Sequence, residues 1–185
     1  MKNHPVDALF SDGPPHTNTY IASQLKKTLG IPWLMDFQDP WTQADYYKMM
    51  PIGKRASRRH IQMEQECFHN ADKISIASPS WKTDLENIGA KNVDVLYYGY
   101  DEDDFANSKK KESKKYFDIV HIGLLGHDRS PGDLVEILES LSSNKSIRLI
   151  LAGQVDQSVL ESLVRKSSQI EVQELEIISR KKALQ

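Results

Sequence analysis

The stretch Trp33-Leu34-Met35-Asp36-Phe37-Gln38-Asp39-Pro40-Trp41-Thr42 decides the fold of this chain. Its first five residues predict a short buried strand, and Asp39-Pro40 predicts the turn that ends it. Carboxylates, an amide and an indole therefore crowd together where the strand stops. In an open α/β sheet, ligands bind just beyond the carboxyl ends of the strands. These side chains can form a binding or catalytic site, or Asp39-Pro40 can serve only as a turn.

Strand-like and helix-like segments alternate along the rest of the chain. The apolar pattern predicts strands over 6–11, 33–37, 73–77, 93–98, 117–122, 147–152 and 170–172. It predicts helices over 17–29, 54–71, 78–88, 131–141 and 156–166, and a last helix beginning near Ile178. Short connections marked by Gly or Pro separate these segments. This order is typical of βαβ units with parallel strands, so we expect an α/β fold.

A lysine-rich segment interrupts the pattern at residues 106–115. Such a segment cannot bury apolar surface and is typical of a linker. We therefore expect one domain over residues 1–105 and a second over 116–185. The first has too few strands for a complete doubly wound domain, and the second ends inside a predicted helix. Both domains are expected to be incomplete parts of a protein roughly twice as long.

The composition excludes several classes of protein. The hydrophobic content is 39%, the charged content is 27% and the net charge is −2, which gives no reason to expect nucleic acid as a partner. No apolar segment is long enough to span a membrane, and the first ten residues lack the apolar core of a secretory signal. Cys67 is the only cysteine, so no intrachain disulfide can form. These features favour a cytoplasmic protein. A sheet edge left open by missing strands would favour self-association into an oligomer.

Two further features stand out in the first half. His16 follows Pro14-Pro15 at a predicted strand end, where it can bind a ligand hydroxyl or simply start a helix. Glu64 falls on the predicted buried stripe of helix 54–71, so its carboxylate needs a salt-bridge partner or must face a cleft. The first turns of the same helix are basic over residues 54–60. That segment is either a solvated face or a contact surface for phosphate or an acidic lipid surface.

The second half begins with a strand and a glycine-containing loop, Gly123 to Pro131. Ser130 is a predicted N-cap, with Asp133 completing a capping box. Free N–H groups at such a helix start can hold phosphate, and Arg129 adds a cation. The spacing is not Gly-x-Gly-x-x-Gly, so a purely structural loop is an equal alternative. No pair of His or Cys residues has metal-ligand spacing, so no protein-bound metal is expected.

Several motifs follow one another along the chain. They are Ser11-Asp12-Gly13-Pro14-Pro15-His16, Gly30-Ile31-Pro32-Trp33, Asp36 to Thr42, Glu64 with Ala71-Asp72, Gly99-Tyr100-Asp101 with Asp104-Phe105, Gly123 with Arg129-Ser130-Pro131, and Leu151-Ala152-Gly153. Together and in this order they resemble glycosyltransferase family 4. Two positions depart from the family pattern: Gln38 replaces the usual Arg, and Tyr98 replaces the usual Asn. The Glu-x₇-Glu region of the family is expected beyond Gln185.

The resemblance implies a GT-B fold, in which two Rossmann-like domains face each other across a cleft. The first domain would bind a glycan or lipid-linked acceptor, and the second a nucleotide-diphospho-sugar donor, without metal or other cofactor and with retention of configuration. Asp39 would accept the proton of the acceptor hydroxyl or orient it, with Asp36 in support. The residues implied in acceptor binding are His16, Gln38, Trp41 and Glu64. Those implied in donor binding are Gly123, Arg129 and Ser130.

Three functions fit this pattern. The first is a hexosyltransferase of polysaccharide or glycan assembly, at the inner face of the plasma membrane or free in the cytoplasm. The second is a non-catalytic remnant that binds nucleotide weakly or serves as a scaffold, which the neutral Gln38 favours. The third is a sugar-nucleotide epimerase with the same two-domain plan. The Asp-Pro-Trp motif ending at Trp41 argues against the third.

Overall fold

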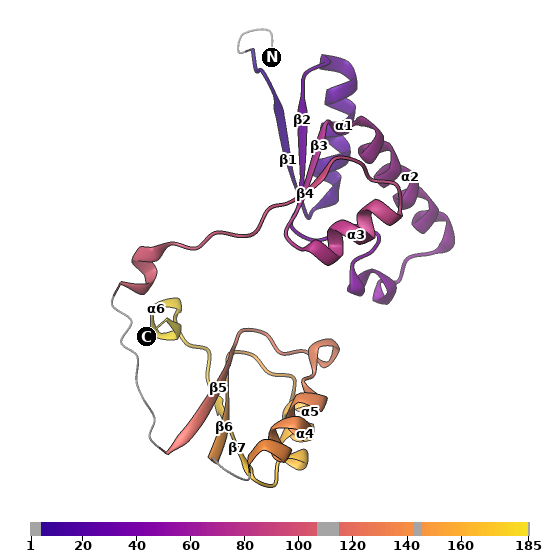
Figure 1. Ribbon diagram of the computed structural model, residues 1–185. Coiled ribbons are helices and arrows are strands. Elements are labelled where there is room, and N and C mark those ends of the chain that lie inside the picture. Colours follow the sequence, from indigo (N-terminus) through magenta and orange to yellow (C-terminus); the bar gives the residue numbers. More distant parts are fainter. Residues whose placement is uncertain (1–4, 107–114, 143–145, 185) are drawn as a thin grey trace. The chain divides into compact units, whose positions relative to one another are not determined.

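The chain forms two compact units in the computed structural model, residues 1–99 and residues 100–185 (Figure 1). The structure describes residues 5–106, 115–142 and 146–184. Each unit has one sheet of parallel strands connected through helices. The predicted α/β class with two parallel sheets is therefore confirmed. Most of the predicted linker, residues 107–114, lies outside the described residues, and the predicted domain boundaries stay predictions.

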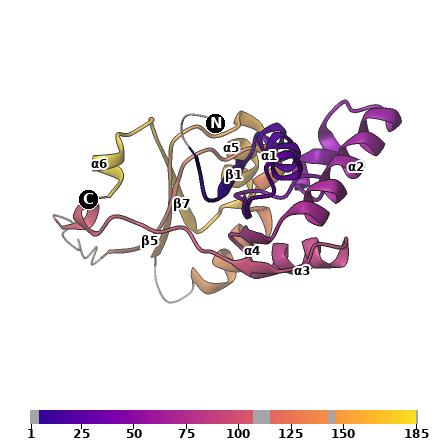
Figure 2. The same cartoon turned by 90° about the horizontal axis from the view of Figure 1, so that it is seen from above.

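The first unit contains a four-stranded sheet in the order β1-β2-β3-β4. Its strands are β1 (Leu9–Gly13), β2 (Trp33–Phe37), β3 (Lys73–Ile76) and β4 (Val93–Val95). Its helices are α1 (His16–Leu29), the 3₁₀ helix η1 (Asp45–Met49), α2 (Lys54–Asn70) and α3 (Pro79–Asn87). Because the strands follow one another in sequence order, right-handed crossovers place successive helices on one side of the sheet. Figure 1 shows α1, α2 and α3 on that side, and Figure 2 shows α1 nearly end-on beside β1.

The core of the first unit lies between the sheet and these helices. Trp33, Met35 and Phe37 alternate along β2 and are at most 1% exposed, and Ile74 and Ile76 of β3 are fully buried. A two-residue period puts these side chains on the helix-covered face and the residues between them on the other face. Asp36 therefore belongs to the face of the sheet opposite the helices.

The buried faces of α1 and α2 agree with the predicted ones at Ala22, Glu64 and Phe68, which are buried, and differ from them elsewhere. The pattern in α1 predicts that Ile21 and Leu25 are buried, but they are 52% and 37% exposed. Small residues take their place: Thr19, Ala22 and Ser23 are buried. Small side chains let two helices approach closely, and Ser23 accepts a hydrogen bond from Asn70 of α2 at 2.8 Å. In α2, the apolar pattern also predicts a buried Ile61, but this side chain is 46% exposed.

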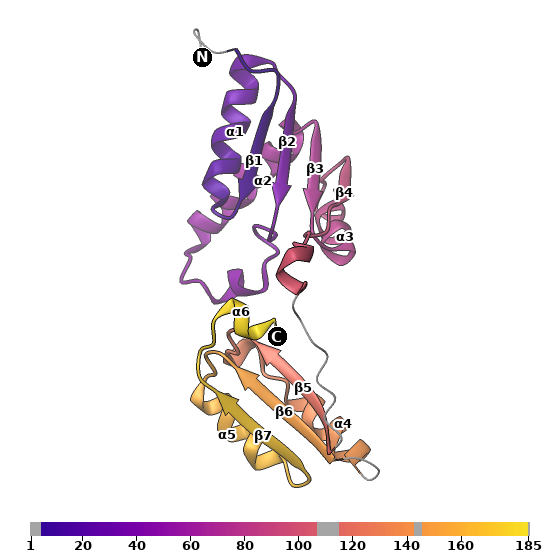
Figure 3. The same ribbon diagram turned by 90° about the vertical axis from the view of Figure 1, so that its left-hand side faces the viewer.

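The second unit contains a three-stranded parallel sheet in the order β5-β6-β7 (Figure 3). Its strands are β5 (Tyr116–Ile122), β6 (Ser146–Ala152) and β7 (Ile170–Leu175). Its helices are η2 (Glu102–Phe105), η3 (His127–Arg129), α4 (Gly132–Leu141), α5 (Gln157–Lys166) and α6 (Arg180–Ala183). The core packs Val135, Leu149, Leu151 and Leu163 between the sheet and α4 and α5. Within the described ranges, no helix is both long and apolar enough to cross a membrane.

Candidate sites at the strand ends

A cluster of aromatic rings surrounds His16 at the carboxyl ends of β1 and β2. His16 is the first residue of α1. Its imidazole stacks on the Trp41 indole, with ring centroids 5.2 Å apart and ring planes inclined by 12°. Phe37 meets the imidazole in an edge-on arrangement at 5.4 Å. On the Trp41 side, His60 packs against the indole at 5.8 Å. These aromatic contacts fix the orientation of the His16 ring.

Both ring nitrogens of His16 are buried, and neither makes a hydrogen bond of normal geometry within the described residues, although the Pro40 backbone lies close enough to favour protonation of the ring. Burial lowers the pKa of His16 from its ordinary value of 6.5 to about 4, although the nearby Asp39 carboxylate opposes this shift. At neutral pH the ring is therefore uncharged, with one N–H donor and one lone pair. A ligand hydroxyl can accept from one nitrogen or donate to the other. Unsatisfied buried polar atoms of this kind suit a binding site.

A row of polar side chains crosses the same strand ends. Asp12 of β1 is in register with Asp36 of β2, and Asp36 with Ser75 of β3, so the three lie on one face of the sheet. The Ser75 hydroxyl donates to Asp36 at 2.5 Å. The Gln38 amide donates to one carboxylate oxygen of Asp12 at 3.0 Å. The other oxygen of Asp12 is buried and lacks a partner in the described part of the chain. It is a buried acceptor whose hydrogen-bonding capacity is not used within the described residues.

Asp39 lies within electrostatic reach of three rings. Its carboxylate favours protonation of His16, and it adds to the effect of burial in raising the pKa of Tyr46 and of Tyr98. Tyr98 follows β4 and donates its hydroxyl to the Gln38 carbonyl at 3.0 Å. The Asp39 carboxylate itself is partly exposed. It is therefore a solvent-accessible base beside a buried, neutral imidazole.

Glu64 holds the loop that carries Trp41. Its side chain is fully buried on α2. The carboxylate accepts from the Thr42 backbone N–H at 3.1 Å and from the Thr42 hydroxyl at 2.5 Å, while Gln43 donates to that hydroxyl at 2.5 Å. Burial raises the pKa of Glu64, and the bonds from Thr42 oppose the shift. The partner of Glu64 is thus a hydroxyl and a backbone amide in place of the cation of a salt bridge. This geometry makes Glu64 a residue that positions the loop.

The predicted residues of the first half all lie on or against the carboxyl ends of β1 and β2, with Asp36 on the face of the sheet opposite the helices. They are His16, Asp36, Gln38, Asp39, Trp41 and Glu64. Trp41 is only 7% exposed, and its indole contacts the rings of His16 and His60. Contact of any of the six with an acceptor stays a prediction. Local patterns in the sequence do not assign Asp12, Ser75 or Tyr98 to a site. Strand register joins Asp12 and Ser75 through Asp36, and a hydrogen bond joins Tyr98 to Gln38, and both depend on partners distant in the sequence.

Two glycines bring the backbone of the second unit close together after β5 and β6. Gly123 and Gly153 have φ values of +133° and +136°, which favour glycine. A Cβ atom on Gly153 would lie only 2.3 Å from the Gly123 carbonyl oxygen. The Gly123 N–H donates to the Ala152 carbonyl at 2.9 Å. Gly123 therefore shapes the loop that leads toward Arg129, and its contact with a donor stays a prediction.

Arg129 and Ser130 lie between this loop and α4. The Arg129 side chain is 75% exposed, and its Nε is 3.8 Å from the Asp128 carboxylate. The predicted capping box is wrong: Pro131 occupies the N-cap position, no side chain caps the helix, and Ser130 ends η3. Because α4 begins at Gly132, Ser130 stands one residue too early to act as its cap. Arg129 is an accessible cation, and a role of either residue in donor binding stays a prediction.

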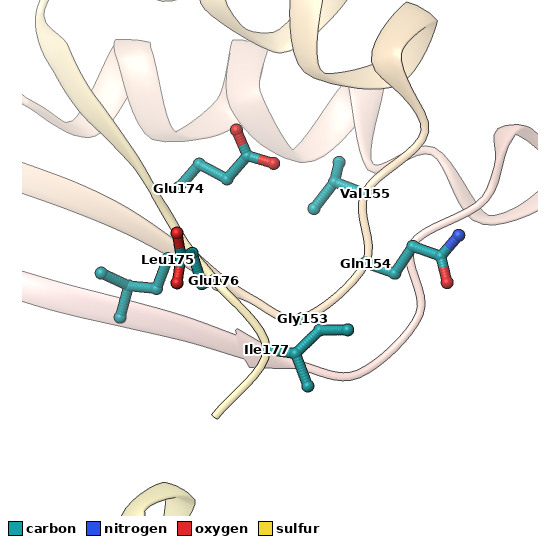
Figure 4. Close-up of a pocket in the computed structure, with 7 residues that line it drawn as sticks. All are labelled: Gly153, Gln154, Val155, Glu174, Leu175, Glu176 and Ile177. Atoms are coloured by element: carbon teal, nitrogen blue, oxygen red, sulfur yellow. The ribbon is translucent and has the colours of Figure 1, made fainter. Parts of the chain in front are cut away.

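A pocket of about 630 Å³ lies at the carboxyl ends of β6 and β7. Its lining residues are Gly153, Gln154, Val155, Glu174, Leu175, Glu176 and Ile177 (Figure 4). Figure 4 shows Glu174 extending from β7 toward Val155. Carboxylates accept hydrogen bonds from hydroxyls and repel phosphate. This pocket therefore suits the hydroxyl-bearing part of a ligand. Among the described residues, no group of three or more His, Cys, Asp or Glu side chains is arranged to hold a metal ion.

Comparison with known proteins bears on the architecture. Neither a protein-family model nor a curated protein matches the sequence. Among solved structures, Anabaena HepE (Alr3699) in complex with UDP matches 93% of this chain with a TM-score of 0.61 and 11% identity. HepE in complex with UDP and glucose matches 97% with a TM-score of 0.54 and 12% identity. Acinetobacter baumannii MurG aligns over 100% of the chain at 15% identity, with a TM-score of 0.47.

The chain has a GT-B type fold. At identities of 11% and 12%, the likeness to HepE shows the fold alone. The chain spans about half the length of the two HepE structures, 49% and 50%. The UDP and the glucose are ligands of HepE.

Proposed function

We propose that this chain is part of a family 4 glycosyltransferase that transfers a sugar from a nucleotide-diphospho-sugar to a hydroxyl of a glycan or lipid-linked acceptor. The first unit would bind the acceptor and the second the donor. The observation that carries the proposal is the cluster at the ends of β1 and β2, where Asp39 stands beside the unpaired nitrogens of His16. The occurrence of UDP in a structure of the same fold is in keeping with the assignment of the second unit.

The first unit offers the groups that sugar transfer needs at the acceptor. Asp39 would take the proton of the attacking hydroxyl or orient that hydroxyl. His16 would hold the hydroxyl through a ring nitrogen, since its imidazole is uncharged at neutral pH. Asp36 and the free oxygen of Asp12 would accept hydrogen bonds from further hydroxyls of the acceptor, as Asp36 already accepts one from the Ser75 hydroxyl. Glu64 and Trp41 would act indirectly by fixing the loop and the ring of His16.

The second unit offers a cation for the leaving group. Stabilising the charge that develops on the diphosphate is the main task in breaking a sugar–phosphate bond. Arg129 is exposed and can pair with phosphate oxygens in a bidentate manner. The Gly123 loop would allow the backbone to approach the diphosphate closely, and Glu174 and Glu176 would accept hydrogen bonds from ribose or sugar hydroxyls. The donor would be the only small molecule required besides the acceptor.

Calorimetric titration with UDP, GDP and their sugar conjugates tests the donor assignment. We expect Arg129→Ala to weaken binding of the preferred nucleotide at least about tenfold, since a charge-assisted bidentate contact is lost. Arg165→Ala, which removes an exposed arginine from α5, should leave the affinity unchanged. Absence of nucleotide binding, or an Arg129→Ala variant that binds like the unmodified chain, would refute the donor assignment.

A non-catalytic nucleotide-binding protein is the second candidate, and one observation favours it. Gln38 stands where family 4 members carry Arg, and its neutral amide is bonded to Asp12. The first unit therefore lacks a cation at that position. If this candidate is right, sugar nucleotides bind with the expected dependence on Arg129, but no sugar is transferred to any acceptor. Release of free UDP or GDP during incubation with an acceptor mixture separates the two candidates.

A further inference from the structure

Three aspartates stand at the carboxyl ends of β1 and β2 without a cationic partner. They are Asp12, Asp36 and Asp39, and within the described ranges no Lys or Arg forms an ion pair with any of them. Asp12 accepts a hydrogen bond from the Gln38 amide at 3.0 Å, and Asp36 accepts one from the Ser75 hydroxyl at 2.5 Å. Both donors are neutral. Like charges on neighbouring strands repel each other, so this edge of the sheet favours a ligand that brings positive charge.

The aromatic ring of Tyr98 lies within electrostatic reach of all three carboxylates. Its hydroxyl donates to the Gln38 carbonyl at 3.0 Å, which ties the chain after β4 to the end of β2. The carboxylates add to the effect of burial in raising the pKa of Tyr98. The residue is nevertheless 66% exposed, so its ring is open to a ligand. An ammonium group can use both features at once, through hydrogen bonds to carboxylates and through attraction to the ring face.

Buried polar atoms at the same strand end remain for the hydroxyls of a ligand. Thr19 is fully buried, and its hydroxyl has no hydrogen-bond partner in the part of the chain that the structure describes. This hydroxyl lies 3.0 Å, and Nδ1 of His16 lies 2.9 Å, from the position that a Cβ on Gly13 would take. Both atoms therefore face the backbone of Gly13, the residue that follows Asp12 at the end of β1. Buried polar atoms that are left unused indicate a ligand with hydroxyl groups.

Two other kinds of cation fit these observations less well. A metal ion needs several ligands that converge on one point, and no three His, Cys, Asp or Glu side chains among the described residues do so. A lysine side chain of a protein partner would pair with the carboxylates but would leave Thr19 and His16 unused. A small molecule that carries both an ammonium group and hydroxyls uses both sets of groups.

We infer that the acceptor is an amino sugar with a free amine, whose ammonium group binds between the carboxylates of Asp12 and Asp36 and the ring of Tyr98. This inference rests on the proposed function, because it names the acceptor of that reaction. An ammonium group has no lone pair, so a hydroxyl of the sugar remains the nucleophile. Gln38 makes the site selective, because the Arg of family 4 at this position would pair with Asp12 and repel an ammonium group.

Calorimetric titration of the full chain with two matched sugars tests the inference. Methyl glucosaminide carries a free amine where methyl N-acetylglucosaminide carries a neutral amide. In buffer acidic enough to protonate the amine, the glucosaminide should bind at least about tenfold more tightly, since charge-assisted hydrogen bonds replace neutral ones. Asp12→Asn/Asp36→Asn keeps both hydrogen-bond acceptors and should remove this preference. Asp7→Asn/Asp84→Asn removes two exposed carboxylates elsewhere in the first unit and should keep it.

A charge added at Gln38 provides the opposite test. Gln38→Arg places a guanidinium beside Asp12 and should weaken binding of the glucosaminide at least about tenfold. Gln62→Arg adds the same charge at an exposed position of α2 and should bind the glucosaminide as the unmodified chain does. Circular dichroism of each variant shows whether a loss of binding reflects a loss of folding.

The outcomes separate this inference from the proposed function. Equal affinities for the two sugars, equal losses in Gln38→Arg and Gln62→Arg, or methylammonium bound as tightly as the glucosaminide would each overturn the inference. Sugar transfer to neutral acceptors as fast as to amino sugars would also overturn it, while the proposed function would stand. If no nucleotide binds, the donor assignment fails, but a preference for the amine that depends on Asp12 and Asp36 still supports the amine site.

Discussion

The imidazole of His16 stacks on the indole of Trp41, with 5.2 Å between ring centroids and 12° between ring planes. The two residues are 25 positions apart in the sequence: His16 is the first residue of α1, and Trp41 follows β2. Aromatic packing fixes the imidazole, since neither ring nitrogen makes a hydrogen bond of normal geometry within the described residues and the Pro40 backbone offers only a weak contact. Its two nitrogens therefore keep their hydrogen-bonding capacity for a ligand. The same packing excludes water and makes the protonated ring unfavourable.

The buried imidazole predicts a specific pH dependence of stability. Between about pH 6.5 and pH 4 the unfolded chain gains a proton at His16 that the folded chain excludes. The free energy of unfolding should therefore fall as the pH is lowered through this range, by about 1–2 kcal/mol for this residue after allowance for partial exposure. His16→Phe keeps the aromatic packing and should remove this contribution. Urea unfolding at a series of pH values, followed by tryptophan fluorescence, measures it.

The fluorescence reports on the correct unit, because the chain's three tryptophans, Trp33, Trp41 and Trp81, all lie in the first unit. His69→Gln, which changes an exposed histidine of α2, is the control and should follow the unmodified chain at every pH. Subtracting the curves of the His16→Phe variant removes the contribution of the carboxylates that titrate in the same range. If the free energy of unfolding changed with pH in the same way for His16→Phe and for the unmodified chain, the assignment of a buried neutral imidazole would be contradicted.

Asp39 can be tested separately from folding. If it accepts or orients the proton of the acceptor hydroxyl, Asp39→Asn should lower the rate of sugar transfer by about 10²–10⁴-fold. The melting temperature should change little, because Asp39 is partly exposed. Asp45→Asn removes a nearby exposed carboxylate in η1 and should keep full activity. The measurement is the initial rate of nucleotide release with acceptor present, and an active Asp39→Asn variant would exclude the residue from the mechanism.

The local elements of this fold could be predicted from the sequence because each depends on its own residues. The strand at Trp33–Phe37 is found at its predicted bounds. Pro32 keeps α1 from continuing, and Gly30 ends α1 in the left-handed conformation that only a residue such as glycine adopts easily. The crowding of polar residues after that strand also indicated where the candidate site of the first unit lies.

Features that depend on partners distant in the sequence could not be predicted. The buried face of α1 is set by its contact with α2, where Ser23 meets Asn70, and an apolar count along α1 alone selects Ile21 instead. The row of Asp12, Asp36 and Ser75 depends on the register of three strands. Neither relationship leaves a periodic signal in the local sequence. The prediction of a capping box at α4 was wrong for a different reason. The helix begins at Gly132, one residue later than Ser130 as N-cap would require.

The buried carboxylate of Glu64 predicts a large effect of mutation. Glu64→Ala would leave the Thr42 N–H and hydroxyl without their acceptor and open a cavity beneath the loop that carries Trp41. We expect the free energy of unfolding to fall by about 3 kcal/mol. Glu66→Ala, on the same helix, removes a surface carboxylate bonded to Gln24 and Lys27 and should cost less than about 1 kcal/mol. Urea unfolding followed by tryptophan fluorescence compares the two, and equal losses would contradict the loop-holding role of Glu64.

The close approach of Gly153 to Gly123 predicts a graded series of glycine substitutions in the second unit. Gly153→Ala combines a positive φ with a Cβ placed 2.3 Å from a backbone oxygen, so the unit should lose more than about 3 kcal/mol. Gly123→Ala meets only the strain of its positive φ and should cost about 1–2 kcal/mol. Gly99→Ala is the control outside this unit: it has neither problem and should leave the second unit unchanged. Hydrogen exchange of peptides from β5 and β6 measures the loss, because the described second unit contains no tryptophan. If β5 and β6 were as well protected from hydrogen exchange in the Gly153→Ala variant as in the Gly123→Ala variant, the backbone contact between the two loops would be absent in solution.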